Sequence, residues 1–271
     1  MIKRILNNIK IPHKIPYKLI SKIKFIINKK KYNKEFYENQ QNQIFDKLNF
    51  DRNLGLKKLN KIKEKHSFLN ELEMRSEHQV LFSSLSCNSK LDINEILEIG
   101  TFDASNAFLF SLLFENSNIE TIDLESNQDD FKNFYERKEN FNRFVEIRNQ
   151  NLLRSNKINF REINSINLIN YKKKYDLIWI DGAHGYPVVC MDILNSIKLI
   201  RAGGYIICDD IYVNSINSDK MYRSNAGNET LNELKKEGII NFDLIFKRLD
   251  AENNCLEENR KFIAIVSLTT S

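Results

Sequence analysis

Seven short apolar runs beyond residue 92 predict the strands of a sheet. They cover residues 93–99, 119–125, 158–163, 177–180, 205–208, 242–246 and 262–268. The run at 177–180 is unbroken and too short for a helix, which is typical of a strand buried on both faces. Helical spacing of apolar residues separates several of these runs, so we expect an α/β protein with a mostly parallel seven-stranded sheet. The last two runs have a hairpin-like connection, which predicts an antiparallel last strand.

The parallel arrangement is clearest in residues 175–212. After the first strand of this segment, apolar positions recur at roughly helical intervals over residues 188–200. Gly203-Gly204 is expected to end this helix before the strand at 205–208 begins. A strand, a crossover helix and a second strand in this order form a parallel pair.

Three carboxylates follow the two strands of this unit. Asp181 ends the first strand and Asp209-Asp210 ends the second, so in a parallel sheet all three lie at the edge where open α/β sheets bind ligands. Carboxylates held close together repel one another unless a cation or a proton compensates, which predicts a divalent metal. The alternative is that Asp181 caps the following helix and the other two only solubilise a loop.

A turn of small residues follows the first strand. Glu98 and Gly100 lead into Ala104-Ser105, and an apolar helix is expected over residues 107–114. This layout brings backbone N–H groups and a helix N-terminus close to a ligand. Because Gly100 is the turn's one glycine, the dinucleotide pattern Gly-x-Gly-x-x-Gly is absent, which argues against a nicotinamide cofactor.

Polar residues also follow the second and third strands. Asp123 lies 23 residues beyond Gly100 at the tip of the second strand, where an acid accepts hydrogen bonds from ribose hydroxyls. Asn164-Ser165 stands at the exit of the third strand. The polar segment 212–238 lies next to the carboxylate edge and is a candidate lid.

Taken together, these residues resemble the class I S-adenosylmethionine-dependent methyltransferases over roughly residues 93–268. The segment 98–102 is similar to their first motif, Asp123 to their ribose-binding acid, and residues 181–186 with Gly203-Gly204 and Asp209-Asp210 to their later motifs. The resemblance implies a Rossmann-like fold and S-adenosyl-L-methionine as cofactor. The cofactor-binding residues that it implies are Glu98, Gly100, Thr101, Phe102, Ser105, Asp123, Asn164, Ser165 and Asp181. Ala104 replaces the usual second glycine of the first motif, and alanine fits there if φ is negative.

More narrowly, the set Asp181, His184 and Asp209-Asp210 is similar to metal-dependent sugar and natural-product O-methyltransferases of the macrolide and macrocin type. In that family the counterparts of Asp181, Asp209 and Asp210 hold magnesium, and a histidine placed like His184 is the general base. The resemblance therefore implies His184 and Asp181 as catalytic residues and O-methylation of a saccharide or small-metabolite hydroxyl. A sugar hydroxyl is a poor nucleophile until a metal lowers its pKa and a base removes the proton.

Residues 1–34 form a basic arm that holds 11 of the 41 Lys and Arg residues and no acid, which leaves 30 basic against 36 acidic side chains in the rest of the chain. Pro12 and Pro16 break any early helix, and the lysines and apolar residues after them predict a short basic amphipathic helix. Such a helix favours contact with an anionic membrane, with nucleic acid as the less favoured partner. A solvated arm, or one that contacts another copy in a homo-oligomer, explains the same pattern.

Residues 35–92 contain no proline and one glycine, and their apolar spacing predicts two or three helices that cover the sheet. We therefore divide the chain into the basic arm, this helical cover region and a domain at 93–271.

No apolar run approaches the roughly 20 residues that span a bilayer, and the N-terminus lacks the order of a signal peptide. We therefore expect a cytoplasmic protein, with the arm able to bring it to the inner face of the membrane. The four cysteines have no metal-ligand spacing and fit a reducing compartment.

Two other functions remain open at this point. One is a methyltransferase of the same fold that needs no metal, in which Asp181 or His184 acts alone. The other is a non-catalytic relative that docks on a membrane or nucleic acid through its basic arm. The sequence does not identify the acceptor, because acceptor specificity lies in loops that carry no general code.

Overall fold

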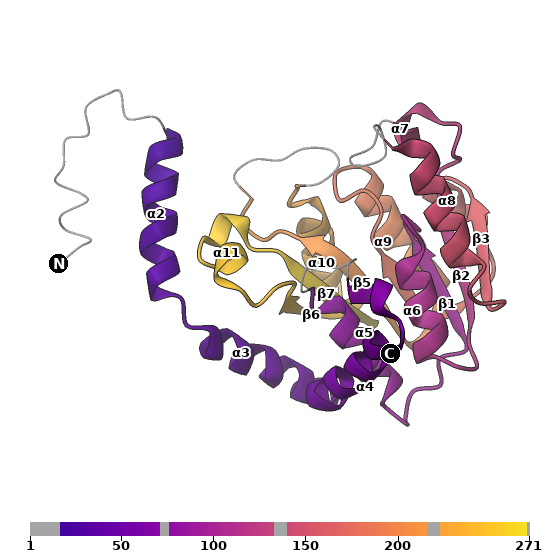
Figure 1. The fold of residues 1–271 in the computed structure, drawn as a ribbon, viewed down its shortest axis with the longest axis horizontal. Helices are drawn as coiled ribbons and strands as arrows, with labels where there is room; N and C mark the ends of the chain where they lie inside the picture. Colours follow the sequence, from indigo (N-terminus) through magenta and orange to yellow (C-terminus); the bar gives the residue numbers. More distant parts are fainter. Residues whose placement is uncertain (1–16, 71–75, 133–139, 216–222, 270–271) are drawn as a thin grey trace.

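The computed structural model describes residues 17–70, 76–132, 140–215 and 223–269. Its centre is a seven-stranded sheet with the strand order β3-β2-β1-β4-β5-β7-β6 (Figure 1). The strands are β1 (Glu95–Ile99), β2 (Asn118–Asp123), β3 (Ile158–Glu162), β4 (Tyr175–Ile180), β5 (Ile200–Ile211), β6 (Ile240–Phe246) and β7 (Phe262–Leu268). The first five pair in parallel, and β7 pairs antiparallel with both β5 and β6. The predicted Rossmann-like sheet with an antiparallel last strand is confirmed.

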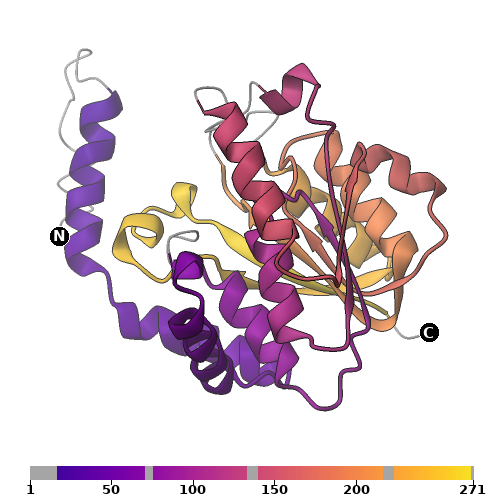
Figure 2. The same cartoon turned by 45° about the vertical axis from the view of Figure 1, so that its right-hand side comes forward.

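Helices cover both faces of the sheet (Figures 1 and 2). The helices described besides α2 are α3 (Lys34–Lys47), α4 (Arg52–Lys65), α5 (His78–Ser86), α6 (Ser105–Leu113), α7 (Asp129–Lys132), α8 (Phe141–Leu152), α9 (Val188–Leu199), α10 (Ala226–Lys236) and α11 (Ala251–Asn254), with 3₁₀ turns η1 (Ser67–Asn70), η2 (Ser165–Asn170) and η3 (Glu257–Asn259). Successive residues of a strand face opposite sides, so Trp179 packs in the core beneath α5 and α6, whereas Ile178 and Ile180 pack in the core beneath α9 and α10. Both faces of β4 are therefore buried, as its unbroken apolar run predicts.

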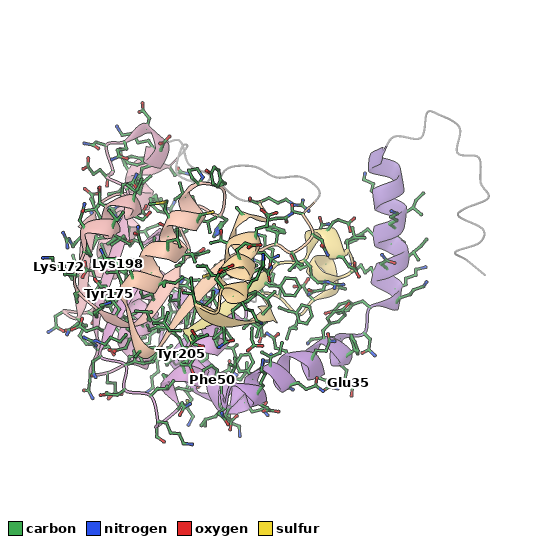
Figure 3. All side chains as sticks on the ribbon, turned by 180° about the vertical axis from the view of Figure 1, so that it is seen from behind. Glu35, Phe50, Lys172, Tyr175, Lys198 and Tyr205 are labelled. Atoms are coloured by element: carbon green, nitrogen blue, oxygen red, sulfur yellow. The ribbon has the colours of Figure 1, made fainter. Side chains whose placement is uncertain are left out.

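The expected helical cover is present as α3, α4, α5 and η1, and Phe50 between α3 and α4 packs edge-on against Tyr205 of β5 (Figure 3). The basic arm contains α2 (Tyr17–Lys31), while residues 1–16 lie outside the described part of the chain. Residues 216–222 of the candidate lid lie outside it too. Among the described residues, no helix is long and apolar enough to cross a membrane.

The role expected of Gly203-Gly204 is wrong. Helix α9 already ends at Leu199, because Ile200 adopts an extended backbone, and the two glycines lie inside β5. A Cβ on Gly204 would come within 2.6 Å of the carbonyl oxygen of Asp176, so glycine is needed there for the close approach of β5 to β4.

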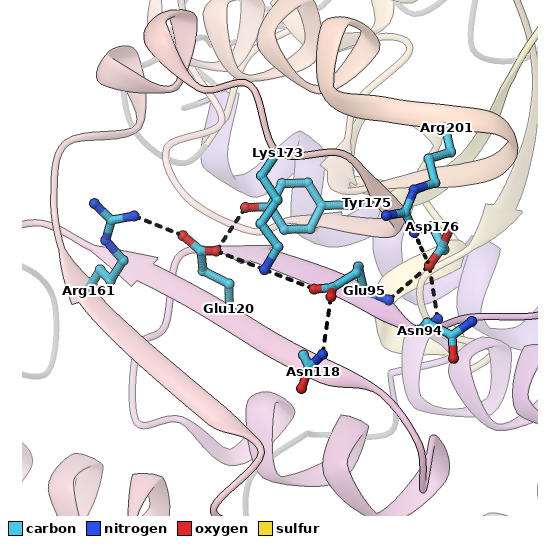
Figure 4. Close-up of polar contacts among 9 residues, drawn as sticks. All are labelled: Asn94, Glu95, Asn118, Glu120, Arg161, Lys173, Tyr175, Asp176 and Arg201. Atoms are coloured by element: carbon cyan, nitrogen blue, oxygen red, sulfur yellow. Dashed lines mark hydrogen bonds and ion pairs between the residues drawn. The ribbon is translucent and has the colours of Figure 1, made fainter.

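Ion pairs and hydrogen bonds join the amino ends of the strands (Figure 4). The Tyr175 hydroxyl donates to Glu120 at 2.9 Å, and Lys173 lies 3.3 Å from the same carboxylate. Asp176 accepts a hydrogen bond from Arg201 at 2.8 Å. These contacts pair charged groups of neighbouring strands at this edge, whereas the predicted site residues lie at the opposite, carboxyl edge.

Candidate active site

The turn after β1 has an unusual backbone. Gly100, Phe102 and Ala104 all have positive φ, at 101°, 48° and 62°. The N–H groups of Gly100 and Thr101 donate to the carbonyl of Ile122 on β2 at 2.9 and 3.2 Å, which fixes the turn against the neighbouring strand. The turn is thus held in a conformation that glycine adopts without strain and other residues adopt at a cost.

Ala104 does not have the negative φ at which alanine would fit the turn. Its φ is positive, so the alanine at the N-cap of α6 is strained by about 1 kcal/mol or more, and it is fully buried. The position has the left-handed backbone that glycine adopts without strain, and this chain keeps that backbone with a Cβ present.

A cavity of about 430 Å³ lies over this turn at the carboxyl edge of the sheet. That volume lies within the range of small-molecule sites. The expected residues in its wall are Gly100, Thr101, Phe102, Ser105, Asp123, Asn164, Ser165, Asp181 and His184. Thus eight of the nine expected cofactor residues lie together around one space with the expected base, although they come from four separate segments.

Glu98 is the expected cofactor residue that does not line the cavity. It is buried behind the turn, where the Thr121 hydroxyl donates to it and also lies 2.7 Å from the Thr101 hydroxyl. Burial raises the pKa of Glu98 to about 8, so this side chain holds a proton at neutral pH. Glu98 therefore supports the turn from beneath.

Asp123 is fixed at the tip of β2. Its two carboxylate oxygens accept hydrogen bonds from the backbone N–H groups of Phe102 at 3.0 Å and Leu124 at 2.8 Å. A carboxylate oxygen accepts more than one hydrogen bond, so both oxygens can also receive ligand hydroxyls. The geometry suits the predicted recognition of ribose.

Asp192, a fully buried acid on α9, also lines the cavity and was not among the predicted site residues. Burial raises its pKa to about 7, and the neighbouring Ser165 side chain opposes that shift only in part. The available signal was one carboxylate in the first turns of an otherwise apolar helix. Asp103, Asn106 and Asp130 also line the cavity and were missed.

His184 lies between two carboxylates. Its Nε2 is 3.7 Å from Oδ1 of Asp181 and 3.9 Å from Oδ2 of Asp210, so the loop after β4 brings the imidazole to the tip of β5. Burial lowers the pKa of His184, and the neighbouring carboxylates offset this only in part. The imidazole is therefore neutral at neutral pH and can accept a proton.

Asp209 and Asp210 lie in a β-bulge. Cys208 pairs with Ala264 and Ile211 with Phe262, so two residues of β5 oppose one of β7. Asp210 has a φ of 51°, which breaks the alternation of side chains along the strand. As a result both carboxylates contact the ammonium group of Lys247, and Lys261 contacts Asp210 as well.

Comparison with known protein families agrees with this architecture. Residues 97–211 match the model of a family described as a methyltransferase domain. This segment of the chain carries a methyltransferase domain. The matched segment begins in β1 and ends with β5. It therefore contains the Gly100 turn, the cavity wall and the carboxylates of Asp181, Asp209 and Asp210, which we call the acidic edge.

Solved structures share the fold of this methyltransferase domain at low sequence identity. A candidate O-methyltransferase from Klebsiella pneumoniae is 13% identical, with a TM-score of 0.54 over 88% of this chain and 99% of that one. The O-methyltransferase TomG from Streptomyces achromogenes, solved with SAM, is 13% identical, with a TM-score of 0.50 over 88% and 100%. The N-methyltransferase NodS from Bradyrhizobium japonicum WM9 is also 13% identical, with a TM-score of 0.50 over 72% and 96%. No curated protein matches the chain in sequence.

The cavity wall of the methyltransferase domain fits S-adenosylmethionine, but its acidic edge does not fit magnesium. The turn at Gly100, the carboxylate of Asp123 and the volume of the cavity all agree with a nucleoside-bearing cofactor. In contrast, no group of three or more potential ligand side chains in the described ranges is arranged to hold a metal. The expected site of Asp181, Asp209 and Asp210 is not assembled, because lysine ammonium groups already pair with the last two.

Proposed function

We propose that this domain transfers a methyl group from S-adenosylmethionine to a hydroxyl oxygen of a small metabolite or saccharide, without a metal ion. The observation that carries the proposal is the position of His184. The imidazole stands in the wall of the same cavity as the Gly100 turn and Asp123, with carboxylates of Asp181 and Asp210 within 4 Å. A base beside a cofactor cavity is what methylation of a hydroxyl requires.

The turn at Gly100 and the N-terminus of α6 would hold the cofactor on one side, and Asp123 would accept the ribose hydroxyls. Asn164 and Ser165 at the exit of β3 would contact it farther along the cavity. When bound, the cofactor supplies an electrophilic methyl group on a sulfonium with a good leaving group. The protein's remaining tasks are to orient the acceptor and to remove its proton.

His184 would accept the hydroxyl proton at Nε2. The resulting imidazolium would lie 3.7 Å from Asp181 and 3.9 Å from Asp210, so these carboxylates stabilise the charge that forms as the methyl group is transferred. Lys247 and Lys261 keep Asp210 ionised for this role, because they lower its pKa despite the opposing effect of burial. His184 is therefore proposed as the catalytic base and Asp181 as its charge-stabilising partner.

The first test concerns cofactor binding at Asp123. Replacing Asp123 by Ala removes the acceptors for the ribose hydroxyls, so we expect the affinity for S-adenosylhomocysteine to fall roughly ten- to hundredfold, the effect of losing hydrogen bonds to a charged group. Calorimetric titration measures this affinity. Asp243→Asn on β6, which alters an exposed ion pair with Lys47 of α3, is the control and should leave the affinity unchanged. If Asp123→Ala bound S-adenosylhomocysteine as tightly as the wild-type protein does, the proposed ribose contact at Asp123 would be wrong.

We also propose that α2 rests on an anionic membrane surface. Ile23, Ile26 and Ile27 are 50%, 56% and 39% exposed on a helix that also carries Lys22, Lys24, Lys29, Lys30 and Lys31. Two views show this helix standing apart from the sheet (Figures 1 and 2). Exposed isoleucines flanked by lysines are typical of helices that lie in the plane of a lipid interface.

The membrane test compares vesicles with and without phosphatidylserine. The protein should sediment with the anionic vesicles, and Lys22→Glu/Lys24→Glu should weaken this binding at least tenfold, since each lysine near the surface contributes about 1 kcal/mol. Lys235→Glu/Lys236→Glu on α10 is the matched control. Equal sedimentation with neutral vesicles, or binding to duplex DNA in the absence of vesicle binding, would refute the membrane assignment.

A further inference from the structure

Two lysines from the two ends of the β6–β7 connection meet at the acidic edge. Lys247 directly follows β6 and Lys261 directly precedes β7. The Nζ of Lys247 contacts Asp209 and lies 2.7 Å from Oδ1 of Asp210, while the Nζ of Lys261 contacts Oδ2 of Asp210. Two positive charges therefore compensate the two carboxylates of the β5 bulge.

The backbone of this lysine pair is fixed. Phe246 pairs with Phe262 across the antiparallel strands, and the N–H of Lys247 donates to the carbonyl of Lys261 at 3.0 Å. The carbonyl of Lys247 in turn accepts the N–H of Glu77 at 2.8 Å, which ties this corner to the helical cover. Because β7 also pairs with β5, the sheet itself delivers both ammonium groups to Asp209 and Asp210.

Burial makes these contacts more than surface ion pairs. The side chains of Lys247, Asp209 and Asp210 are 8%, 2% and 9% exposed. A charge with so little access to water is tolerated only when it is paired, so removal of either partner strongly disfavours the other. Burial by itself would raise the pKa of Asp209, but Lys247 holds that pKa below its usual value.

A divalent ion would compete directly with the lysines. Magnesium and calcium need several oxygen ligands at about 2.0 to 2.6 Å, and carboxylates are their preferred side-chain ligands. Oδ1 and Oδ2 of Asp210 and one oxygen of Asp209 already contact ammonium groups. An incoming ion would have to displace those groups and would leave positive charges beside itself.

We propose that Lys247 and Lys261 act as a built-in cation pair in place of a divalent metal at the tip of β5, so that the acidic edge binds no metal. This inference deepens the proposed function by naming the groups that make it metal-independent. The pair holds Asp210 beside His184, 3.9 Å away, which makes the lysines positioning residues for the base. The metal-binding part of the inference is separate from methyl transfer.

The test is a titration with Mn²⁺, followed by the paramagnetic signal of the free ion. Wild-type protein should show no site that depends on Asp209. Lys247→Ala/Lys261→Ala should gain one Mn²⁺ site with at least tenfold higher affinity than wild type, and added Asp209→Asn should remove it. Lys235→Ala/Lys236→Ala makes the same charge change on α10 and should gain no such site.

Stoichiometric Mn²⁺ binding to wild-type protein that Asp209→Asn removes would overturn the inference, and so would a folded double variant that gains no site. Lys261→Ala alone, at the more exposed lysine, serves if the double variant does not fold, and it too should gain Mn²⁺ affinity that Asp209→Asn removes. A S-adenosylhomocysteine titration run in parallel distinguishes the two claims. A protein that binds this product but no Mn²⁺ supports both, whereas one that binds neither leaves the cation pair intact and refutes the methyltransferase assignment.

Discussion

Replacement of His184 by Ala is expected to lower kcat by roughly 10²- to 10⁴-fold, the usual contribution of a positioned general base. The physical reason is that His184 is the neutral group beside the cavity whose protonated form Asp181 and Asp210 would stabilise. Transfer of labelled methyl groups to a panel of hydroxyl-bearing metabolites and saccharides measures the effect. His66→Ala, at the end of α4, is the matched control and should retain full activity.

The pH profile gives the same prediction a second readout. Burial lowers the pKa of His184 below its ordinary 6.5, so the base is unprotonated at neutral pH and the rate should fall only as pH drops through that lowered value. His184→Ala should lose this acid limb, and added imidazole should restore part of the rate. A variant with wild-type activity and an unchanged pH profile would exclude His184 as the base.

Gly100→Ala is expected to destabilise the protein by about 3 to 5 kcal/mol, from steric overlap added to backbone strain. An added Cβ would lie 2.3 Å from the carbonyl oxygen of Asp181 and 2.9 Å from the nitrogen of Gly182, which are backbone atoms that cannot rotate away. The same clash would push the turn after β1 away from β4, so cofactor binding should be lost together with stability. Urea unfolding and cofactor titration measure the two effects.

Gly238→Ala is the matched control for Gly100→Ala. Gly238 also has a positive φ, of 71°, but a Cβ there meets no atom within 4 Å. Only the cost of the left-handed backbone remains, about 1 kcal/mol. If the two substitutions destabilise the protein equally, then the close approach of the turn to β4 is not what requires glycine at position 100.

The fold could be predicted from the sequence because each central strand is buried on both faces. The run in β4 is apolar from Leu177 to Ile180, and the run in β1 is apolar apart from Glu95 and Glu98. Such runs separated by helical periodicity permit few arrangements other than a mostly parallel sheet. The cavity residues could be predicted for a related reason, since they follow strands whose carboxyl ends meet at one edge. Asp123 and His184 need no knowledge of side-chain packing to be placed there.

The metal site could not be judged from the sequence in the same way. Lys247 and Lys261 are separated by 13 residues and are brought together only by the antiparallel register of β6 and β7. The bulge that turns both Asp209 and Asp210 toward Lys247 depends on a one-residue mismatch with β7. A pattern of acids along one strand does not reveal which cation neutralises them.

The backbone conformation of the turn after β1 could not be predicted from the sequence either. Ala104 adopts a positive φ that alanine disfavours. The first turn of α6 and the hydrogen bond from the Ala104 N–H to the carbonyl of Thr101 hold the backbone in this conformation. Glu98 was assigned to the cofactor from its place in a motif, yet the hydroxyl of Thr121 holds it behind the turn. In both cases the deciding contacts come from neighbouring elements and not from the motif itself.

Calorimetric titration of S-adenosylhomocysteine into the purified protein in the presence of EDTA separates a metal-independent methyltransferase from the alternatives. We expect binding of one molecule per chain in the cavity between the Gly100 turn and Asp123, with an affinity that added magnesium does not change. No binding with or without magnesium would contradict the methyltransferase assignment, and binding that requires magnesium would contradict its independence of metal.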